Sequence, residues 1–365
     1  MSMYRPTGYY ETASEWAKLT YTHHEIVFPA HRDISRMPRT IDGGLHWKHD
    51  NEVRQMPPAG SVTVIPGGRL WGKNGTVVTP DDKVVWDLSI EYRHDPYTLP
   101  IFHEQIGQPE RLDGNVADLT FCASDTYYHW MLDVLPRVEL LSKYKGPGID
   151  VYVCNLDWKC SFQWDTLTRL GVTTSKIIET YPGIHLQARN LIAPSSVGYT
   201  GHAPAWACEF LRSRFLYADG TSRPARMERI YLSRQKARWR KVENEEEVIG
   251  LLRRYGFEIL TDELDRMSVS EQAALFHAAD YIVGPHGSGL TNVLFCHPDA
   301  KVLEFHSPNY VNPLYWVLGN HVGVDYFYLI GEGPRPPDGV DPKEDWENIR
   351  VDLGKLERSL QLMGC

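Results

Sequence analysis

The sequence predicts an α/β protein in which parallel sheets are covered by helices, and three observations support this fold class. Runs of strand length alternate with helix-length apolar patterns between about residues 115 and 306, which is typical of βαβ units. The chain has 365 residues, a length that accommodates two domains of roughly 100 to 200 residues each. Its 42% hydrophobic and 23% charged content is ordinary for a soluble protein with a sizeable core.

The composition and the apolar pattern of the N-terminal half change after about residue 110. Its first 110 residues are rich in Pro, Gly, His and aromatic side chains, and pieces such as SVTVIPG predict short strands joined by turns. Beyond them we expect strands at 115–121, 149–155 and 189–196 and helices at 126–144 and 161–171. Pro136 lies inside the first of these helices and predicts a kink or an early end there.

The C-terminal half alternates more clearly and predicts a Rossmann-like half. Asn244 followed by Glu247, and Ser268 followed by Glu271, have the spacing of a capping box, so each pair predicts a helix start. A further helix is expected at 288–296, after a glycine-rich turn. The expected strands are 228–234, 257–260, 280–284 and 300–306.

The best domain boundary is the connecting segment GYTGHAPAW, residues 198–206. We expect an N-terminal α/β domain at 1–200, with an irregular β-rich start. A Rossmann-like domain is expected at 206–330. The remaining residues, 331–365, are expected to form an extension that can pack back on the N-terminal domain.

Charge and composition limit the partners and the compartment. The net charge of −9, from 38 basic and 47 acidic residues, argues against nucleic acid as a partner. The N-terminus has no basic region followed by an apolar stretch, and no window has about 18 uninterrupted apolar residues, so we expect neither a signal peptide nor a transmembrane helix. Six cysteines without C-x-x-C spacing predict reduced thiols. We therefore expect a cytoplasmic protein, whose aromatic-rich N-terminal part allows peripheral membrane contact.

A cluster of cations follows the strand at 228–234. Ser233 and Arg234 end this strand, and the following loop adds Lys236, Arg238, Arg240 and Lys241. Ligands of open parallel sheets bind beyond the carboxyl ends of the strands, and arginine forks match phosphate oxygens. The cluster fits a diphosphate, and a solvated basic loop is the alternative.

The turn GPHGSG, residues 284–289, follows another strand and opens a helix. Glycines let phosphate oxygens approach the unpaired N–H groups of a helix start, and His286 can donate to a phosphate or sugar oxygen. A tight turn with glycine for steric reasons is the alternative, and the pattern is not the G-x-G-x-x-G of dinucleotide sites. A metal is the least favoured occupant, because the sequence offers no partner ligand for His286.

Two further places carry candidate polar groups. Glu304 ends a strand and could accept from ribose or sugar hydroxyls, or form a structural ion pair. His129 and Asp133 are four residues apart on one face of the expected helix, so they can pair and accept a proton from a substrate hydroxyl. A metal site would need a third ligand, which is not evident, and a surface pair without function is the alternative.

These segments resemble glycosyltransferase family 61, also described as a domain of capsular-polysaccharide biosynthesis proteins. The resemblance covers about residues 125–305, and its most specific piece is the block GPHGSGLTN after an EQ…LF…AD helix. It implies a GT-B fold, with two Rossmann-like domains facing a central cleft, and inverting transfer of a hexosyl or pentosyl group from a nucleotide sugar, usually UDP-linked. No cofactor and no obligatory metal are implied, and the lack of a D-x-D motif is consistent with this.

The resemblance also assigns roles to residues of this sequence. Asp133 is the expected base, together with His129, and the acceptor is a saccharide or a lipid-linked saccharide. The implied acceptor-side residues are Tyr128, Trp130 and Arg137. The implied donor-binding residues are Ser233, Arg234, Lys236, Arg238, His286, Gly287, Ser288, Gly289, Asn292 and Glu304. Two other classes stay open: another nucleotide-dependent Rossmann enzyme, and a non-catalytic module that binds a nucleotide or carbohydrate.

Overall fold

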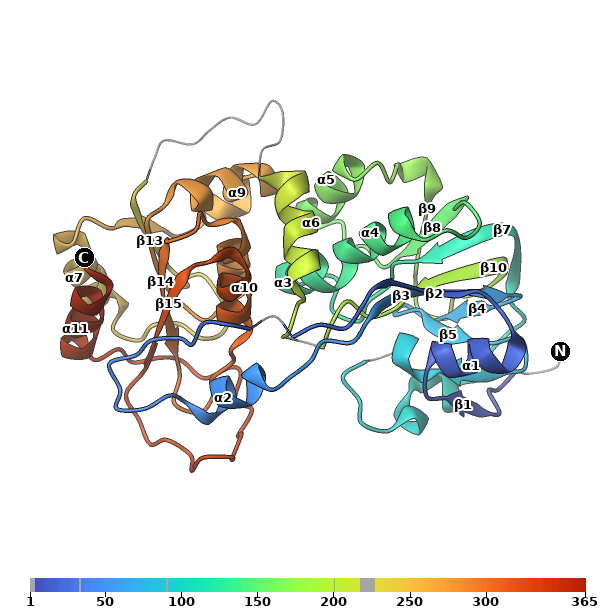
Figure 1. Cartoon of the computed structure of the whole chain (residues 1–365), viewed down its shortest axis with the longest axis horizontal. Coiled ribbons are helices and arrows are strands. Elements are labelled where there is room, and N and C mark those ends of the chain that lie inside the picture. The colour runs from blue at the N-terminus through green and yellow to red at the C-terminus, as the bar shows by residue number, and fades with distance from the viewer. Residues whose placement is uncertain (1–3, 33, 90, 200, 217–226) are drawn as a thin grey trace. The chain divides into compact units, whose positions relative to one another are not determined.

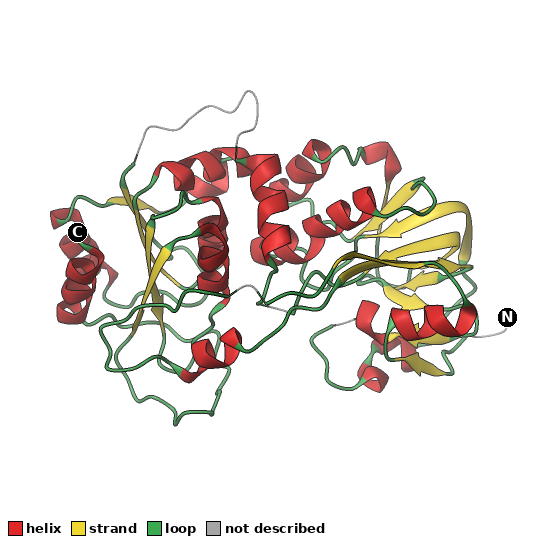
Figure 2. Ribbon diagram, viewed as in Figure 1, coloured by secondary structure: helices red, strands yellow, loops and turns green. Residues whose placement is uncertain are grey.

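The computed structural model describes residues 4–32, 34–89, 91–199, 201–216 and 227–365 (Figure 1). The chain forms two compact units, the N-terminal unit (Met1–His31 and Pro58–Tyr199) and the C-terminal unit (Arg32–Pro57 and Thr200–Cys365). Each contains both helices and strands (Figure 2), so the predicted α/β class is confirmed. The segment Arg32–Pro57 belongs to the C-terminal unit although it comes early in the chain, which the sequence did not predict.

The N-terminal unit is built on a mixed ten-stranded sheet with the order β1-β6-β5-β4-β10-β7-β8-β9, in which β3 pairs with β10 and β2. The strands β10, β7, β8 and β9 run parallel, whereas β3 and β4 run antiparallel to β10. The strands are β1 Gly8–Tyr10, β2 His24–Phe28, β3 Gly60–Pro66, β4 Arg69–Trp71, β5 Thr76–Val78, β6 Lys83–Val85, β7 Glu110–Asp118, β8 Val151–Cys154, β9 Ile177–Glu179 and β10 His185–Pro194.

Helices cover both sides of this sheet. The helices α1 (Ala13–Thr20) and α4 (Leu135–Lys143) both pack on β3 and lie on opposite sides of it in Figure 1. Trp16 of α1 is buried in a core that includes Ile65 and Val116. α5 (Ser161–Arg169) completes the βαβ pattern that the sequence predicted for this half.

The helix predicted at 126–144 is irregular just before Pro136. The short helix α3 (Tyr127–His129) leads into a π-helical segment, Trp130–Val134, and α4 then begins with Pro136 in its first turn. Helical turns run directly into α4, and the Leu135 N–H still donates to the carbonyl of Trp130, so the missing N–H and the ring of Pro136 interrupt the hydrogen-bond ladder at the next position. The helix does not end early at Pro136, because α4 continues to Lys143, and the irregularity is the π-helical segment just before the proline.

The C-terminal unit contains a five-stranded parallel sheet with the order β12-β11-β13-β14-β15. The first four strands along the chain confirm the predicted Rossmann-like half, and β15 extends it. The strands are β11 Arg229–Leu232, β12 Glu258–Leu260, β13 Tyr281–Pro285, β14 Lys301–His306 and β15 Asp325–Ile330. The helices are α2 Trp47–Val53, α6 Ala205–Phe215, α7 Glu245–Arg254, α8 Glu263–Arg266, α9 Val269–Ala278, α10 Leu314–Val322 and α11 Leu353–Met363.

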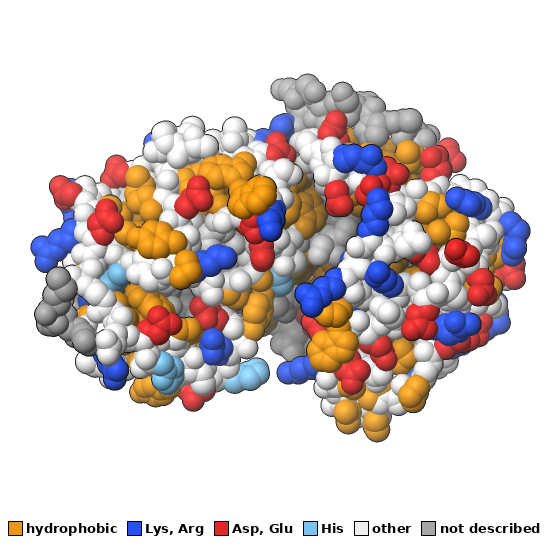
Figure 3. All heavy atoms as spheres, turned by 180° about the vertical axis from the view of Figure 1, so that it is seen from behind, with side chains coloured by type: hydrophobic (Ala, Val, Ile, Leu, Met, Phe, Trp, Pro, Cys, Tyr) orange, Lys and Arg blue, Asp and Glu red, His pale blue; other side chains and the backbone are white. Residues whose placement is uncertain are grey.

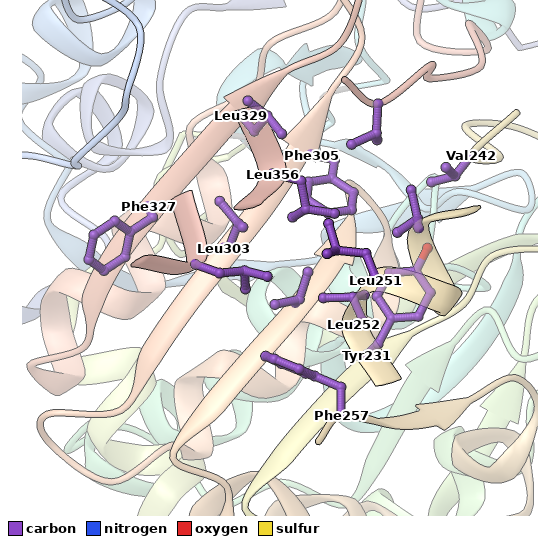
Figure 4. Packing of buried hydrophobic residues seen from close by; sticks show 14 of the residues in the cluster. Tyr231, Val242, Leu251, Leu252, Phe257, Leu303, Phe305, Phe327, Leu329 and Leu356 are labelled. Carbon is purple, nitrogen blue, oxygen red and sulfur yellow. The ribbon is translucent and has the colours of Figure 1, made fainter. Parts of the chain in front are cut away.

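Both faces of this parallel sheet are covered, as such sheets require. Figure 1 shows α7 and α11 on one side of β13 to β15, with α9 and α10 on the other. The core between the sheet and α7 and α11 joins Leu251 to Leu303 and Phe305 (Figure 4). Residues 331–365, for which we expected packing on the N-terminal domain, contribute to this same core through Leu356 and Met363.

Of the two capping boxes predicted in this unit, one is present and the other is not. Ser268 and Glu271 form the predicted capping box at α9. The capping box predicted at Asn244 is wrong, because the Asn244 side chain makes no cap hydrogen bond. Its amide instead donates to the carbonyl of Val351 at 2.9 Å and accepts from the Val351 N–H at 3.0 Å. This pair of bonds competes with the cap and ties the C-terminal residues to the start of α7.

The strand order places a topological switch point between β11 and β13. The chain leaves β11, forms β12 on one side, and returns to the other side of β11 to form β13, β14 and β15 in succession. The connections from β11 and β13 therefore diverge at the carboxyl ends of these two strands. Ligands of open α/β sheets bind at such a point.

Two surface properties bear on partners. On the face in Figure 3, acidic and basic side chains are interspersed, without the continuous basic surface that nucleic acid requires. Among the described residues, no helix combines the length and apolar character needed to cross a bilayer.

Candidate functional site

The switch point carries an arginine that lies directly against the GPHGSG turn. Arg234 follows β11, and Gly287 follows β13 with an extended backbone, φ 173°. A Cβ at position 287 would overlap the Arg234 guanidinium. Glycine is therefore needed here for the close approach and not for its backbone freedom. The helix predicted after the turn is a 3-10 helix, Ser288–Phe295.

A second arginine reaches the same turn. The Nε of Arg240 donates to the carbonyl of His286 at 3.1 Å, and Arg234 donates from Nη2 to the carbonyl of Trp239 at 3.0 Å. Neither arginine forms an ion pair with a described carboxylate. Burial, together with the charge of Arg240, lowers the pKa of Arg234 to about 10. Two crowded guanidinium groups without a counter-charge make this edge of the sheet attractive to an anion.

Two other cations of the basic loop, Lys236 and Arg238, contact groups away from the turn. Lys236 forms an ion pair with Asp262, with 2.5 Å between Nζ and Oδ2. The guanidinium of Arg238 lies over the ring of Trp239, 4.3 Å from its centroid. Of the five predicted cations, Arg234 and Arg240 thus lie at the turn. Arg240 was not among the predicted donor-binding residues. Its contact with a backbone carbonyl has no sequence signature.

Below the turn, Glu304 of β14 is fully buried and both of its oxygens have partners. His286 shares a hydrogen bond between Nδ1 and Oε1, and the Tyr326 hydroxyl donates to Oε2. His306 is also fully buried, with its Nε2 3.7 Å from Oε2. Glu304 therefore lies beneath the turn, where it positions His286. Tyr326 was not predicted, because its strand β15 meets Glu304 only in the folded sheet. His306 was missed although it lies two residues after Glu304 on β14, where strand alternation places both side chains on one face.

Burial controls the protonation of this group. Desolvation raises the pKa of Glu304 well above its usual value and lowers the pKa of His286 well below its usual value. His306 and the nearby cations, foremost Arg240, lower the pKa of His286 further. Both directions favour an uncharged carboxyl and an uncharged imidazole, because a low-dielectric interior disfavours separated charges.

The same three side chains are a candidate metal set, so the sequence-based reason against a metal was wrong. His286, Glu304 and His306 bring ligand atoms within 4.8 Å of one another, and two histidines with a glutamate are a known zinc combination. Two observations count against a cation. Both oxygens of Glu304 are already hydrogen-bonded, and Arg234, Arg240 and Lys48 place positive charge nearby.

The remaining predicted donor-side residues occupy the borders of the turn. Ser288 and Gly289 begin the 3-10 helix. Asn292 is fully buried, and its amide donates to Gln272 of α9 at 2.7 Å, so it fastens that helix to the turn. The Ser233 hydroxyl accepts from the N–H of Gln235 at 3.2 Å and shapes the start of the basic loop.

The N-terminal unit contains the second candidate group, in and next to the π-helical segment. The His129 Nδ1 lies 2.7 Å from the Asp133 Oδ2, with 19% and 11% of their side chains exposed. The hydroxyl of Tyr92 lies 3.1 Å from the His129 Nε2, and Tyr92 has a positive φ of 56°. A π-helix and a left-handed bulky residue are both uncommon and concentrate at functional sites. The predicted pair is thus formed at a locally unfavourable backbone.

The predicted acceptor-side side chains are mostly in the core. Trp130 is fully buried and donates from its indole to the Thr166 hydroxyl at 2.8 Å. Arg137 is buried and donates to the carbonyl of Thr120 at 2.8 Å. Tyr128 is only 4% exposed. None of the three presents a stacking face to solvent, so His129, Asp133 and Tyr92 are the accessible polar groups of this candidate site.

Comparisons with known proteins agree with the sequence resemblance. The family model described as Glycosyltransferase 61 matches residues 127–303, a range that contains the His129–Asp133 pair and the GPHGSG turn. The beta-1,2-xylosyltransferase RCN11 of Oryza sativa subsp. japonica is 31% identical over 77 residues, which cover 20% of this chain and 14% of that protein. The beta-1,2-xylosyltransferase of Arabidopsis thaliana is 27% identical over 134 residues, or 33% of this chain and 23% of that protein. The chain thus matches less than a quarter of the length of either relative.

Proposed function

We propose that this chain, whose residues 127–303 belong to glycosyltransferase family 61, transfers a sugar from a nucleotide sugar to a saccharide acceptor. The observation that carries the proposal is the pair Arg234 and Arg240 at the GPHGSG turn. These arginines stand at the switch point of the C-terminal sheet, where such folds bind their ligands. Neither has a carboxylate partner among the described residues.

On the donor side, the diphosphate lies across the turn. Arg234 and Arg240 neutralise its charge, and the backbone N–H groups at Gly287, Ser288 and Gly289 approach its oxygens. Because two guanidinium groups supply positive charge at the leaving diphosphate, transfer proceeds without a divalent metal. Full activity in the presence of EDTA would support this part of the proposal, and restoration by added Mn²⁺ would contradict it.

The nucleotide is UDP and the transferred group is a hexosyl or pentosyl unit. The family membership supports a nucleotide sugar, and the names of the two relatives make a xylosyl group the first to test. A dinucleotide is disfavoured, because the turn lacks the G-x-G-x-x-G pattern. A thermal-shift screen with UDP, GDP, CMP and NAD separates these ligands, and only UDP should raise the melting temperature strongly.

On the acceptor side, Asp133 removes the proton of the attacking hydroxyl. The hydroxyl oxygen bonds to the anomeric carbon while the bond from that carbon to the phosphate oxygen breaks, and the electron pair leaves with the diphosphate. A single displacement of this kind inverts the anomeric configuration. His129 orients Asp133 through its 2.7 Å contact. The proposal includes the GT-B fold that the family resemblance implies.

The biological setting is polysaccharide or glycan synthesis, such as capsule formation, in the cytoplasm. A lipid-linked acceptor would bring the protein to the membrane surface. Incubation with UDP-sugars and an acceptor panel tests the activity: nucleotide release coupled to a mass increase of the acceptor supports transfer. UDP binding without either product would instead identify a non-catalytic module.

A further inference from the structure

The two ring nitrogens of His286 have different surroundings. Nδ1 is hydrogen-bonded to Glu304. Nε2 has no hydrogen bond to any described residue, yet it is not among the fully enclosed polar atoms, unlike both ring nitrogens of His306. Nε2 is therefore the one edge of this buried ring that an incoming ligand can reach. His286 directly precedes Gly287, the residue against which the Arg234 guanidinium lies.

Tyr326 specifies which oxygen of Glu304 can carry a proton. A phenol donates its hydroxyl proton, so Oε2, which receives it, acts as the acceptor oxygen. A proton on Glu304 then belongs on Oε1, the oxygen that faces the His286 Nδ1. In this state Glu304 donates, Nδ1 accepts, and the ring hydrogen of a neutral His286 lies on Nε2.

Three aromatic rings and three cations lie near His286. His306, Tyr310 and Tyr315 have ring centroids 5.5, 5.3 and 5.0 Å from that of His286. The cations that act on it are Arg234, Arg240 and Lys48. The three cations and the burial all disfavour an imidazolium, and burial also disfavours a carboxylate on Glu304, although the charge of Arg240 opposes that second effect. The balance favours the neutral pair with two protons.

We propose that Glu304 is a positioning residue that stays protonated and holds His286 with its proton on Nε2, so that His286 donates a hydrogen bond to the leaving diphosphate. This inference rests on the proposed function. No proton is transferred in the step: as the bond between the anomeric carbon and the phosphate oxygen breaks, negative charge develops on the oxygen that Nε2–H faces. Loss of the Glu304 proton at high pH would move the ring proton to Nδ1 and turn Nε2 into an acceptor, which repels phosphate.

Two substitutions separate this mechanism from a structural role. Glu304→Gln supplies an amide that donates to Nδ1 and accepts from Tyr326, as a protonated carboxyl does. Glu304→Met has similar length but no donor. UDP affinity, measured by calorimetry from pH 6 to pH 9, should stay within about threefold of wild type in Glu304→Gln and fall about tenfold or more in Glu304→Met, the loss expected for a hydrogen bond to a charged group.

The pH profile is the readout that a merely structural role would not change. Wild-type affinity should fall as pH rises and the Glu304 proton is lost, and Glu304→Gln should lack this decline because its amide does not titrate. If Glu304→Gln instead loses as much affinity as Glu304→Met, a charged carboxylate is required and the proposal is overturned. A stoichiometric divalent metal in the purified wild type, absent after His306→Phe, would overturn it as well.

A measurement on the ligand-free wild type keeps the inference distinct from the proposed function. Nitrogen-15 spectra of histidine-labelled protein, with His286 assigned through His286→Gln, should show the proton on Nε2 at pH 7. A proton on Nδ1 alone, or on both nitrogens, would refute the inference. If the proton is on Nε2 but no nucleotide binds, the proposed function fails while the protonation state assigned to the pair stands.

Discussion

The guanidinium of Arg234 occupies the space that a Cβ at position 287 would need. Because residue 287 is a glycine, the arginine that follows β11 can lie directly against the turn after β13. This contact links the ends of the two strands that border the switch point. It brings the basic loop and the glycine-rich turn together in one candidate anion site. Residues 234 and 287 are 53 positions apart in the numbering.

Gly287→Ala should weaken UDP binding about tenfold or more while the protein stays folded. The added methyl would displace the Arg234 guanidinium and remove a charge-assisted contact with phosphate. The matched control is Gly250→Ala on α7, whose Cβ would meet no heavy atom within 4 Å. Equal losses in the two variants, measured by calorimetry, would refute the proposed role of the Arg234 contact.

Removing single charges from the basic loop should have unequal effects. Arg240→Met is expected to reduce UDP affinity about tenfold or more, because this arginine contacts the turn and has no described carboxylate partner. Lys236→Met should change affinity less than about threefold, because Lys236 is 65% exposed and already paired with Asp262. The same binding assay checks both variants, and a larger loss in Lys236→Met would move the anion site away from the turn.

Asp133→Asn should reduce the rate of transfer about 10²-fold to 10⁴-fold with little change in UDP affinity. The range is that of a lost general base, and donor binding is expected at the other unit. Glu139→Gln is the control, since Glu139 lies on α4 and pairs with Lys143 at 3.3 Å. Initial rates and UDP titrations distinguish the two effects, and unimpaired transfer in Asp133→Asn would remove Asp133 from the mechanism.

His49 should make the protein less stable in mild acid. Burial lowers the pKa of His49 to about 3, so between pH 6.5 and pH 3 the unfolded chain binds a proton that the native state does not. Stability is therefore lost as pH falls, by about 2 kcal/mol from pH 6.5 to pH 5 at about 1.4 kcal/mol per pH unit.

The His49→Phe variant isolates this effect. The His49 ring stacks on Tyr328, with centroids 4.7 Å apart, and neither of its nitrogens has a hydrogen bond to a described residue, so a phenyl ring can replace it. Urea unfolding at pH 7.5 and pH 5 should show a smaller acid-induced loss of stability in the variant than in wild type. An equal loss in both would assign the acid sensitivity to other groups.

Much of the C-terminal fold was predictable, because local signals there agree with tertiary packing. Buried parallel strands are continuous apolar runs, and Ser268 with Glu271 forms the capping box that its spacing indicated. Asn244 shows where this agreement ends: its side chain bonds to Val351, 107 residues away, and no local pattern encodes that contact. For the same reason the sequence did not reveal that Arg32–Pro57 belongs to the C-terminal unit.

The candidate site was predictable in its motifs but not in its contacts. The strand-end rule led to Arg234 and the GPHGSG turn, and helical spacing led to His129 and Asp133. The register of β13, β14 and β15 decides the rest, because Glu304 is paired with Gly284 and Tyr328 across the sheet and lies below the turn. Trp130 was expected on the acceptor side, yet aromatic side chains in a helix also fill cores, and this one does.

Donor profiling tests the central claim most directly. Purified protein, incubated with UDP-xylose, other UDP-sugars, GDP-mannose and CMP-sialic acid, is assayed for nucleotide release, with Gly287→Ala and Gly250→Ala in parallel. Wild type and Gly250→Ala should release UDP from at least one UDP-sugar, and Gly287→Ala should release strongly reduced amounts. Release that is equal in all three proteins, or confined to GDP- or CMP-sugars, would contradict a UDP-sugar diphosphate held at the Arg234–Gly287 contact.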